Sequence, residues 1–356
     1  MTEGKRTTIG SVRLQQFRSY GDDSFEFDPG VNIIVGPNAS GKTNLLEALL
    51  VLARGNSYRA KDLELIRFDD PWGRLDATLT SGGLRTLKLT REPASKSHEI
   101  DGKLYQRLGL NHSLPLVLFE PNHLQLLAGS PERRRNYLDD LLEQTQPGYG
   151  ALRRQYRRTL AQRNALLKRA GGELSTQLFP WNVRLSQLAG QIVRARTRLA
   201  QEIQAGLPTL YEALSRAGTA VALNYAPQSD PETYESFLLK KLEQNAELDR
   251  QRGFTASGPH REDLLVTFDG HPAQLSASRG EARTIVLALK ISELRLLEAA
   301  RCITPLLLLD DVFSELDGKR RHALTDHLSR YQTFITTTDA DLVLQHFAKT
   351  TTIIPL

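Results

Sequence analysis

The chain has 356 residues, of which 40% are hydrophobic and 24% are charged, as expected of a folded globular protein of about two domains. Its single cysteine, Cys302, excludes a disulfide framework and a cysteine-based metal site, and favours a reducing, cytoplasmic setting. No apolar run approaches the roughly 18 residues of a membrane span, so we expect a soluble protein with no membrane partner.

Positive charge is concentrated in the middle of the chain. The net charge is only +5, yet residues 131–200 contain 14 Arg or Lys against 5 Asp or Glu, a net charge of +9. The other residues therefore sum to −4. A basic middle in a mildly acidic frame favours an anionic polymer such as nucleic acid as partner, although a solvated helical surface rich in Arg would look the same.

The N-terminal third is predicted to contain strands around one helix. Val12–Phe17 and Ser24–Phe27 predict an antiparallel pair with its turn at Tyr20–Asp22. A short buried strand at Val31–Val35 is followed by a helix at Lys42–Ala53 whose leucines recur on one face. Alternating stretches at Leu75–Leu79, Leu84–Leu89 and Glu99–Lys103 predict a small, mostly antiparallel sheet. One more buried strand is predicted at Leu114–Phe119.

The middle of the chain has a helical pattern. Ser130 is a suitable N-cap, Pro131 suits the first helical position, and the pattern continues to about Leu248. A hairpin (Leu264–Phe268 with Gln274-Leu275), a helix (Glu281–Ala300) and two strands (Pro305–Leu309 and Phe334–Thr337) are predicted beyond it. We therefore expect an α/β head formed by residues 1–129 and 248–356, interrupted by a helical, basic lid at 130–247.

The strongest motif lies between the strand ending at Val35 and the helix beginning at Lys42. Gly36, Pro37, Asn38, Ala39, Ser40, Gly41, Lys42 and Thr43 fit the phosphate-loop pattern G-x-x-x-x-G-K-[ST]. In such a loop backbone N–H groups surround the α- and β-phosphates, Lys42 reaches the outer phosphates, and the Thr43 hydroxyl ligates Mg²⁺. The sequence therefore predicts an ATP·Mg²⁺ site.

An apolar strand that ends in two acids complements this loop. Asp310 follows Leu306–Leu309, as in a Walker B motif, and is expected to hold Mg²⁺. Asp311 stands where a base that polarises the attacking water is needed, so it is the candidate catalytic residue. Two acids after a strand could also simply begin a helix.

A third motif precedes the long C-terminal helix. Ser276–Glu281 resembles the signature loop of the ATP-binding-cassette superfamily, with Ser278 and Gly280 at its serine and second-glycine positions. In that superfamily this loop caps ATP held by the other subunit, and a hydroxyl with free N–H groups at a helix N-terminus can form an anion site. A capped helix start alone would explain the same residues. Ser314–Asp317 resembles the D-loop that crosses the same dimer interface.

Further motifs along the whole chain resemble the RecF family of DNA-repair ATPases. They are Gln15–Tyr20, Pro121, Leu126–Asp139, Gly258–Asp263 and Leu308–Asp317, the last of them followed by Lys319 or Arg320 and by Leu324. Departures from the pattern are Asn122 where the family usually has an acid, Glu281 where most cassettes have Gln, and a Thr336–Asp339 segment without the switch histidine of transporter-type cassettes.

This resemblance implies a head like those of SMC-type DNA machines, without their long coiled coil. It implies a homodimer that forms on ATP binding, DNA as a ligand, and weak, DNA-stimulated ATP hydrolysis. It also implies work with RecO and RecR that helps RecA load at gapped DNA, in recombinational repair and replication restart.

The basic segment supplies candidate DNA contacts. Arg153, Arg154, Arg157 and Arg158 recur at a spacing that places them on one helical face, with Arg163 nearby. No aromatic or base-reading motif accompanies them, so we expect phosphate contacts with little sequence preference. Their aliphatic stems could instead pack over helix faces, or the guanidinium groups could pair with Glu.

Three other functions use the same motifs. The ATPase subunit of a transporter would have the same head, but not the basic lid. A small-molecule kinase would use the same phosphate loop as a monomer, and would leave the Ser278 loop unexplained. A DNA clamp with negligible turnover is the third, since Asp311 is one methylene shorter than the usual catalytic glutamate.

Overall fold

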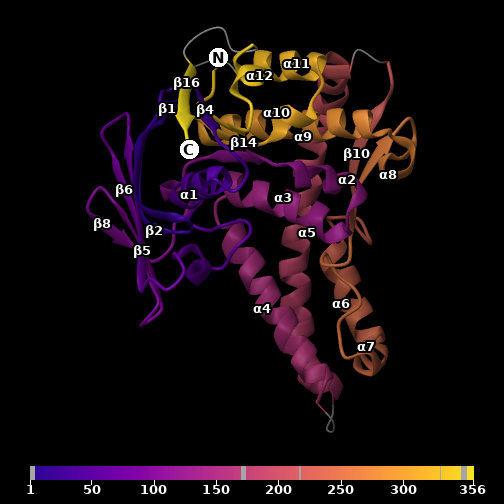
Figure 1. Ribbon diagram of the computed structural model, residues 1–356. Coiled ribbons are helices and arrows are strands. Elements are labelled where there is room, and N and C mark those ends of the chain that lie inside the picture. Colours follow the sequence, from indigo (N-terminus) through magenta and orange to yellow (C-terminus); the bar gives the residue numbers. More distant parts are fainter. Residues whose placement is uncertain (1–4, 170–173, 216–217, 329, 346–350) are drawn as a thin grey trace. The chain divides into compact units, whose positions relative to one another are not determined.

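The computed structural model describes residues 5–169, 174–215, 218–328, 330–345 and 351–356 (Figure 1). The chain forms two compact units, one of Met1–His123 with Lys290–Leu356 and one of Leu124–Leu289. The segment at 130–247 expected to be an insert lies within the second unit, which extends beyond both of its ends. One reason is a strand inside that segment that pairs with residues 263–268.

The first unit contains a five-stranded parallel sheet that positions the predicted site. Its strands are β16 (Thr351–Pro355), β4 (Val31–Val35), β15 (Thr333–Thr337), β14 (Leu306–Asp310) and β9 (Leu116–Phe119), in that spatial order. Four residues of β4 and four of β14 are buried, as expected of apolar strands covered on both faces. The strand β16 was not predicted from the sequence.

A six-stranded antiparallel sheet forms the rest of this unit's framework (Figure 1). Its spatial order is β3 (Tyr20–Glu26), β2 (Ile9–Phe17), β5 (Trp72–Leu79), β6 (Leu84–Thr90), β7 (Ser95–Ile100) and β8 (Lys103–Tyr105). The expected first hairpin is present, but its turn lies at Arg18-Ser19 because Phe17 pairs with Tyr20. A two-stranded parallel pair, β1 (Lys5–Arg6) with β13 (Ile303–Thr304), completes the strands of this unit.

The helix α1 (Lys42–Arg54) packs against strands of both sheets. The sequence predicted one apolar face, yet Lys42 and every residue from Leu45 to Ala53 are buried. A helix enclosed by two sheets buries all of its sides, so a single apolar stripe is not required. Three further helices of this unit follow Asp311. They are α10 (Val312–Glu315), α11 (Gly318–Leu328) and α12 (Ala340–Leu344).

The second unit is mainly helical. Its helices are α2 (Gln125–Ala128), α3 (Pro131–Thr145), α4 (Tyr149–Leu167), α5 (Leu174–Ser215), α6 (Tyr234–Gln244), α7 (Ala246–Arg252) and α8 (Ala273–Ser276). Within it α4 and α5 lie side by side over most of the length of α4 (Figure 1). The helix α9 (Arg279–Arg301) begins in this unit and ends in the first. No described helix is both long and apolar enough to cross a membrane.

A small sheet in the second unit corrects two predictions. Its order is β10 (Val221–Ala226), β11 (Asp263–Phe268) and β12 (His271–Pro272). The strand β10 lies inside the stretch expected to be helical throughout, and buries Val221, Leu223 and Tyr225 in the alternation of a strand. The hairpin partner of β11 is β12, whereas Gln274-Leu275 belong to the short helix α8, so that pairing was wrong.

Candidate nucleotide-binding site

The predicted phosphate-binding residues gather at the carboxyl edge of the parallel sheet. The loop 36–43 follows β4, Asp310 is the last residue of β14, and Glu120 directly follows β9. Asp310 is the register partner of Thr336 on β15. This edge is where open α/β sheets bind ligands, and four of the five strands contribute residues to it.

The loop 36–43 has the backbone of a phosphate cradle. Gly41 has φ of 108°, and a Cβ added there would lie 2.9 Å from Tyr20 Oη, so only glycine fits. At Gly36 an added Cβ would lie 2.8 Å from the carbonyl oxygen of Leu356. Ala39 is also left-handed, with φ of 67°. Pro37, Asn38 and Ala39 are exposed, so this loop is accessible to a phosphate chain.

Lys42 and Tyr20 hold the loop in this shape. The Lys42 ammonium donates to the carbonyl oxygens of Gly36 and Pro37, each at 2.7 Å, so it lies across the loop. Tyr20 Oη donates to the carbonyl oxygen of Gly41 at 3.1 Å. Burial raises the pKa of the Tyr20 phenol, so Tyr20 is a neutral donor at neutral pH.

The metal-binding candidates are in direct contact. Thr43 Oγ1 donates to Asp310 Oδ1 at 3.1 Å, and Thr336 Oγ1 donates to the same oxygen at 2.7 Å. Mg²⁺ commonly takes one or two protein carboxylates and completes its shell with water and phosphate oxygens. One carboxylate beside a threonine hydroxyl and a phosphate loop fits that requirement. Asp311 follows with φ of 51°, and its N–H donates to Thr336 Oγ1 at 2.9 Å.

A cavity of about 390 Å³ adjoins these groups. It is lined by Thr43, Tyr58, Arg59, Glu120, Pro121, Asn122 and Asp310. Arg59 is held by Glu47 of α1, whose Oε2 accepts from Arg59 Nη2 at 2.9 Å, and Glu47 also pairs with Arg18 at 2.8 Å. Burial opposes the ionised form of Glu47, yet the two guanidinium groups keep its pKa below the ordinary value. A fixed cation therefore lies beside the proposed metal site.

The loop that contains Ser278 belongs to the second unit. The Ser278 N–H donates to Glu281 Oε2 at 2.8 Å, and the Glu281 N–H donates to Ser278 Oγ at 3.3 Å. This reciprocal pair is a capping box at the start of α9. Ser278 is exposed and Gly280 is partly buried. In the region resembling a D-loop, the side chains of Ser314 and Glu315 lie outside the described residues.

Comparison with known proteins decides the family. The model of the RecF/RecN/SMC N-terminal domain matches residues 8–354. A "DNA replication and repair protein RecF" from Synechococcus sp. (strain JA-2-3B'a(2-13)) is 36% identical over 348 residues, which cover 93% of this chain and 91% of that protein. The RecF of Halalkalibacterium halodurans is 35% identical and covers 94% of this chain and 93% of its own length. The chain belongs to the RecF family.

Solved structures agree with this assignment. The recombination mediator protein RecF-ATPrS in RecFOR pathway superposes with a TM-score of 0.89 at 28% identity, covering 96% of this chain and 95% of that one. An SMC head bound to the C-winged helix domain of ScpA superposes at 0.57 with 17% identity over 98% of this chain and 93% of that one, a likeness of fold alone. The predicted fold class, an SMC-like cassette ATPase head, is confirmed.

The RecF-like motif at Gly258–Asp263 forms a buried polar network in the second unit. Glu262 accepts hydrogen bonds from Tyr225 Oη at 2.5 Å and from the Gln228 N–H at 3.0 Å. His260 Nδ1 accepts a hydrogen bond from Tyr156 Oη at 2.6 Å. The Nε2–H of the same ring donates to the carbonyl oxygen of Thr255 at 3.0 Å. Burial lowers the pKa of His260 to about 4, so the ring is neutral at neutral pH. These residues hold helices of this RecF-family chain to its small sheet.

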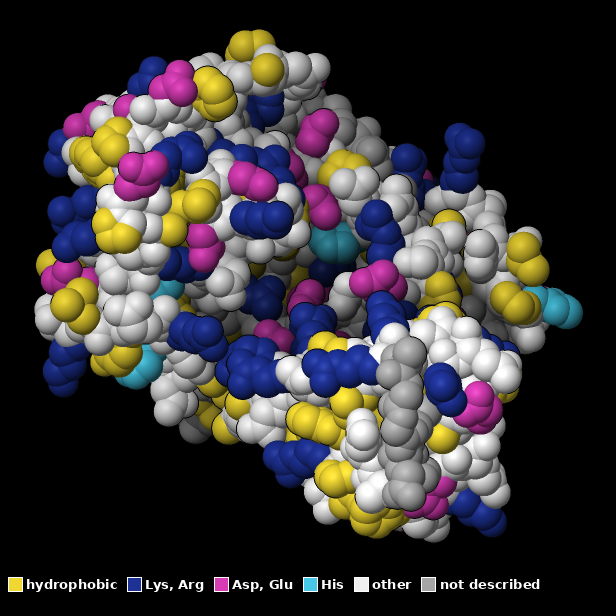
Figure 2. Space-filling model, turned by 90° about the horizontal axis from the view of Figure 1, so that it is seen from below, with side chains coloured by type: hydrophobic (Ala, Val, Ile, Leu, Met, Phe, Trp, Pro, Cys, Tyr) yellow, Lys and Arg dark blue, Asp and Glu magenta, His cyan; other side chains and the backbone are white. Residues whose placement is uncertain are grey.

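The arginines predicted to contact DNA separate into two groups. Arg154, Arg157 and Arg158 are exposed on α4, whereas Arg153 is only 11% exposed and pairs with Asp139, Asp140 and Glu143. Arg163 is fully buried against Asp249 at 2.8 Å. Figure 2 shows many Lys and Arg side chains on the face seen from below. Sequence spacing alone could not separate these groups, because the acids that bind Arg153 lie on another helix.

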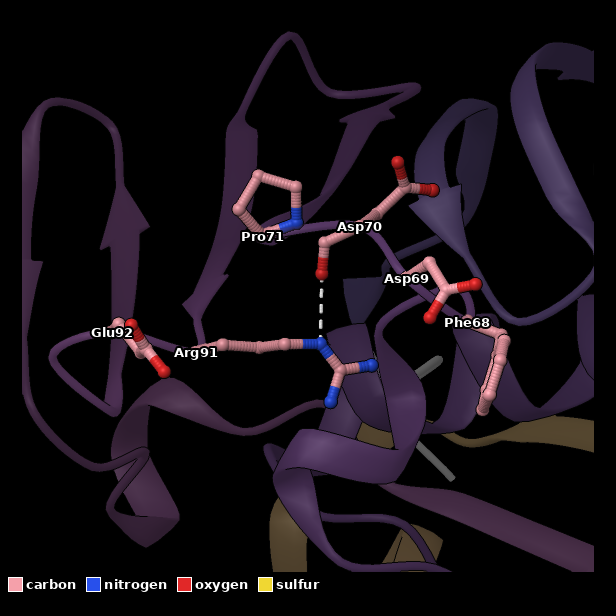
Figure 3. Close-up of a pocket in the computed structure, with 6 residues that line it drawn as sticks. All are labelled: Phe68, Asp69, Asp70, Pro71, Arg91 and Glu92. Carbon is pink, nitrogen blue, oxygen red and sulfur yellow. Dashed lines mark hydrogen bonds between the residues drawn. The ribbon is translucent and has the colours of Figure 1, made fainter.

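A second cavity, of about 340 Å³, lies among loops at the ends of β5 and β6 in the first unit (Figure 3). It is lined by Phe68, Asp69, Asp70, Pro71, Arg91 and Glu92. Arg91 Nε donates to the carbonyl oxygen of Asp70 at 2.7 Å, and Nη2 donates to those of Ile66 and Arg67. This arginine therefore braces the 66–71 loop.

Sequence reasoning missed several residues at the nucleotide site. Thr336 lies in a predicted strand but was not identified as a site residue, and the contacts of Tyr20 were not foreseen within the motif that contains it. Arg59 and Glu47 were not identified. Glu47 could have been found, because a carboxylate within an otherwise apolar helix requires a buried cation.

Proposed function

We propose that this RecF-family chain binds ATP with Mg²⁺ through residues 36–43, dimerises with a second copy when ATP is bound, and acts on DNA as a weak, DNA-stimulated ATPase. The observation that carries the proposal is the contact between Thr43 and Asp310 beside a glycine-dependent loop. Hydroxyl, carboxylate and phosphate cradle lie together at one sheet edge, which is the arrangement that a metal-bound triphosphate requires.

Each side chain has one expected task. Lys42 leaves its two carbonyl partners and donates to the β- and γ-phosphates. Thr43 and Asp310 hold Mg²⁺, which when bound neutralises charge on the phosphate oxygens. Asp311 accepts the proton of the attacking water. A carboxylate shorter than glutamate suits slow turnover, so the alternative of a DNA clamp with negligible hydrolysis differs from this proposal only in rate.

Dimerisation is proposed from the Ser278 loop. The N–H groups at the start of α9 and the Ser278 hydroxyl form a site for negative charge, at present used by Glu281 of the same loop. In a cassette dimer, Ser278 and Gly280 of one subunit cap the ATP that the other subunit holds. Each subunit alone then contains half of each site.

DNA binding is proposed for the helical segment 130–247. The exposed arginines Arg154, Arg157 and Arg158 are placed for phosphate contacts, whereas Arg153 is removed from the set because its charge is used by three acids. Phosphate contacts position a protein on DNA without reading its sequence. We therefore propose binding to gapped or duplex DNA without sequence preference.

The cellular role is proposed from the family. Relatives are named DNA replication and repair proteins, and a solved relative is a recombination mediator in the RecFOR pathway. By this likeness RecO and RecR are the partners, and the task is to help RecA load at gapped DNA in the cytoplasm during repair and replication restart.

Sedimentation velocity of the purified chain tests the proposal. We expect monomers without nucleotide or with ADP, dimers with ATP·Mg²⁺, and faster-sedimenting complexes when DNA is added with ATP. Equal sedimentation in ADP and ATP contradicts the dimer, and no DNA complex under any nucleotide condition contradicts a DNA-directed function.

A further inference from the structure

A buried threonine links the two acids of the nucleotide site. Thr336 lies on β15 and is 0% exposed. Its hydroxyl donates to Asp310 Oδ1 at 2.7 Å and accepts from the N–H of Asp311 at 2.9 Å. A hydroxyl has one proton to donate, and within the described part of the chain the other acceptor in reach is the Leu309 carbonyl oxygen at 3.5 Å. The shorter bond to a charged oxygen is the stronger of the two.

Two hydroxyl groups therefore converge on one oxygen of Asp310. Thr43 donates to Oδ1 at 3.1 Å from the phosphate loop, and Thr336 donates to it from the neighbouring strand. Because both bonds engage Oδ1, they fix the rotation of the carboxylate and leave Oδ2, among the described residues, as the oxygen for a cation or its water. The strand register sets this geometry, since Thr336 is directly opposite Asp310.

The same hydroxyl stabilises an unusual backbone at Asp311. This residue has φ of 51°, a left-handed conformation that is costly for residues other than glycine. The bond from its N–H to Thr336 Oγ1 satisfies a donor that the strand no longer pairs. The hydroxyl of a second buried threonine of β15, Thr333, donates to the carbonyl oxygen of Tyr331 at 3.3 Å.

We propose that Thr336 is a positioning residue of the nucleotide site, which orients the Asp310 carboxylate for Mg²⁺ and fixes Asp311 for its part in turnover. This inference rests on the proposed ATP·Mg²⁺ site. It assigns part of that site to β15, which lies outside the phosphate loop and the Walker B motif. It predicts that the Thr336 hydroxyl affects the Mg²⁺-dependent part of nucleotide binding and leaves the metal-independent part unchanged.

The test compares Thr336→Val with Thr336→Ser, using Thr333→Val as the matched control. The first change removes the hydroxyl at nearly constant volume, the second keeps it, and the third removes a buried hydroxyl elsewhere on the same strand. A fluorescent ATP analogue is titrated with and without Mg²⁺, and binding of Mn²⁺ to the nucleotide complex is followed by electron paramagnetic resonance. These readouts are independent of hydrolysis.

Losing a hydrogen bond to a charged group is expected to raise the Mg²⁺ concentration for half-maximal nucleotide binding about tenfold in Thr336→Val. For Thr336→Ser this Mg²⁺ concentration stays within about threefold of the wild-type value. For Thr333→Val it equals the wild-type value. Binding without Mg²⁺ is the same in all four proteins. If Thr336→Val does not fold, Thr336→Ala replaces it, with the same expectation relative to Thr336→Ser.

Two results overturn the inference while leaving the proposed function intact. One is a Mg²⁺ dependence in Thr336→Val equal to that of the wild type. The other is an equal loss of binding with and without Mg²⁺, which would make Thr336 a structural residue only. A wild-type chain that binds no nucleotide overturns the proposed function, and the inference with it.

Discussion

Arg153 and Asp139 form a buried ion pair, with Arg153 Nε 3.0 Å from Asp139 Oδ2 and side chains that are 11% and 5% exposed. Asp139 also binds Arg196 at 2.9 Å, and the two guanidinium groups keep its pKa below the ordinary value although burial opposes ionisation. Arg153 follows the predicted DNA-binding spacing, yet its charge is neutralised within the fold. The neighbouring Arg154, Arg157 and Arg158 differ from Arg153 because their side chains are exposed.

Replacing Arg154, Arg157 and Arg158 by Ala is expected to weaken duplex binding and to lower the salt slope of the affinity. Each lost phosphate contact lowers that slope by up to about 0.9 because fewer counterions are released. Fluorescence anisotropy with a labelled duplex over a range of salt concentrations measures it. A control triple of exposed cations in the other unit, Lys88, Lys103 and Arg107, should leave the slope unchanged. If both triple variants keep the same salt slope, DNA does not contact Arg154, Arg157 and Arg158.

Arg153→Ala is expected to lower stability rather than DNA affinity. Removing one member of a buried ion pair costs up to about 3 kcal/mol, and less where Arg196 still neutralises Asp139. Urea unfolding measures the loss, and anisotropy on the folded variant measures DNA binding. A normal unfolding midpoint with weakened DNA binding would return Arg153 to the interface.

Lys42→Met is expected to abolish ATP binding while leaving the fold intact. Among the described residues, the Lys42 side chain bonds only the carbonyl groups of its own loop, and the loop's turns depend on Gly41 and its neighbours. Circular dichroism checks the fold, and titration with a fluorescent nucleotide checks binding. An unchanged affinity in the folded variant would reject the phosphate-loop assignment.

Mutations of Asp310 and Asp311, at the end of β14, should have different effects. Asp310→Asn is expected to weaken Mg²⁺-dependent binding. If its amide oxygen accepts from Thr43 and Thr336, its NH₂ group takes the place of Oδ2 and cannot ligate a cation. Asp311→Asn should retain binding and lower turnover by about 10²–10⁴, the usual contribution of a general base. Steady-state ATP hydrolysis and nucleotide titration distinguish them. Normal hydrolysis by Asp311→Asn would move the base to another residue, with Glu315 the next candidate.

Acid stability should depend on His260. Burial lowers its pKa to about 4 from an ordinary value of 6.5, so the folded state favours the neutral ring. The resulting stabilisation is present above pH 6.5 and is lost as the pH falls toward 4. Between pH 7.5 and 5 the wild type should lose about 2 kcal/mol more than His260→Gln, whose amide can replace both hydrogen bonds. Urea midpoints at both values test this, with exposed His322→Gln as control.

Local patterns were sufficient to propose the main residues of a nucleotide site. The strand, loop and helix around Gly36–Thr43 are contiguous in sequence, and the acids of β14 follow an apolar run that only a buried strand explains. The contact between Thr43 and Asp310 follows from parallel strands that end at one edge. The hydrogen bonds of Thr336 could not be predicted without the strand order, because they depend on β15 lying between β4 and β14.

Long-range pairing limited the rest of the prediction. The strand β10 lies in a helical stretch and finds its partner about 40 residues later in β11, so its period-two pattern had no local support. Exposure of arginines was equally unpredictable. Arg163 follows the basic spacing of α4, yet it is buried because Asp249 and Thr255 arrive from a distant part of the chain.

Ser278→Arg is the change that discriminates best between a cassette dimer and a self-contained site. Ser278 lies at the start of α9, whose N–H groups would meet ATP held by the partner subunit. A long cation there should prevent ATP-driven dimerisation by steric clash, while residues 36–43 still bind ATP with near-normal affinity. Hydrolysis and ATP-dependent DNA retention should fall with dimerisation. A kinase-like enzyme, complete within one chain, would be unaffected.

The control for this variant is Ser130→Arg, which places the same side chain at the N-cap of another helix, α3. The Ser278 hydroxyl caps α9, which is worth about 1 kcal/mol, whereas the Ser130 hydroxyl makes no cap hydrogen bond to α3. Ser130→Arg therefore controls for the added side chain at a helix start and not for the lost cap. Sedimentation velocity at saturating ATP·Mg²⁺, beside nucleotide titration, is the measurement. We expect dimers of the wild type and of Ser130→Arg, and monomers of Ser278→Arg with nucleotide bound. If Ser278→Arg dimerises as the wild type does, ATP is not capped by this loop and the dimer must form through another surface.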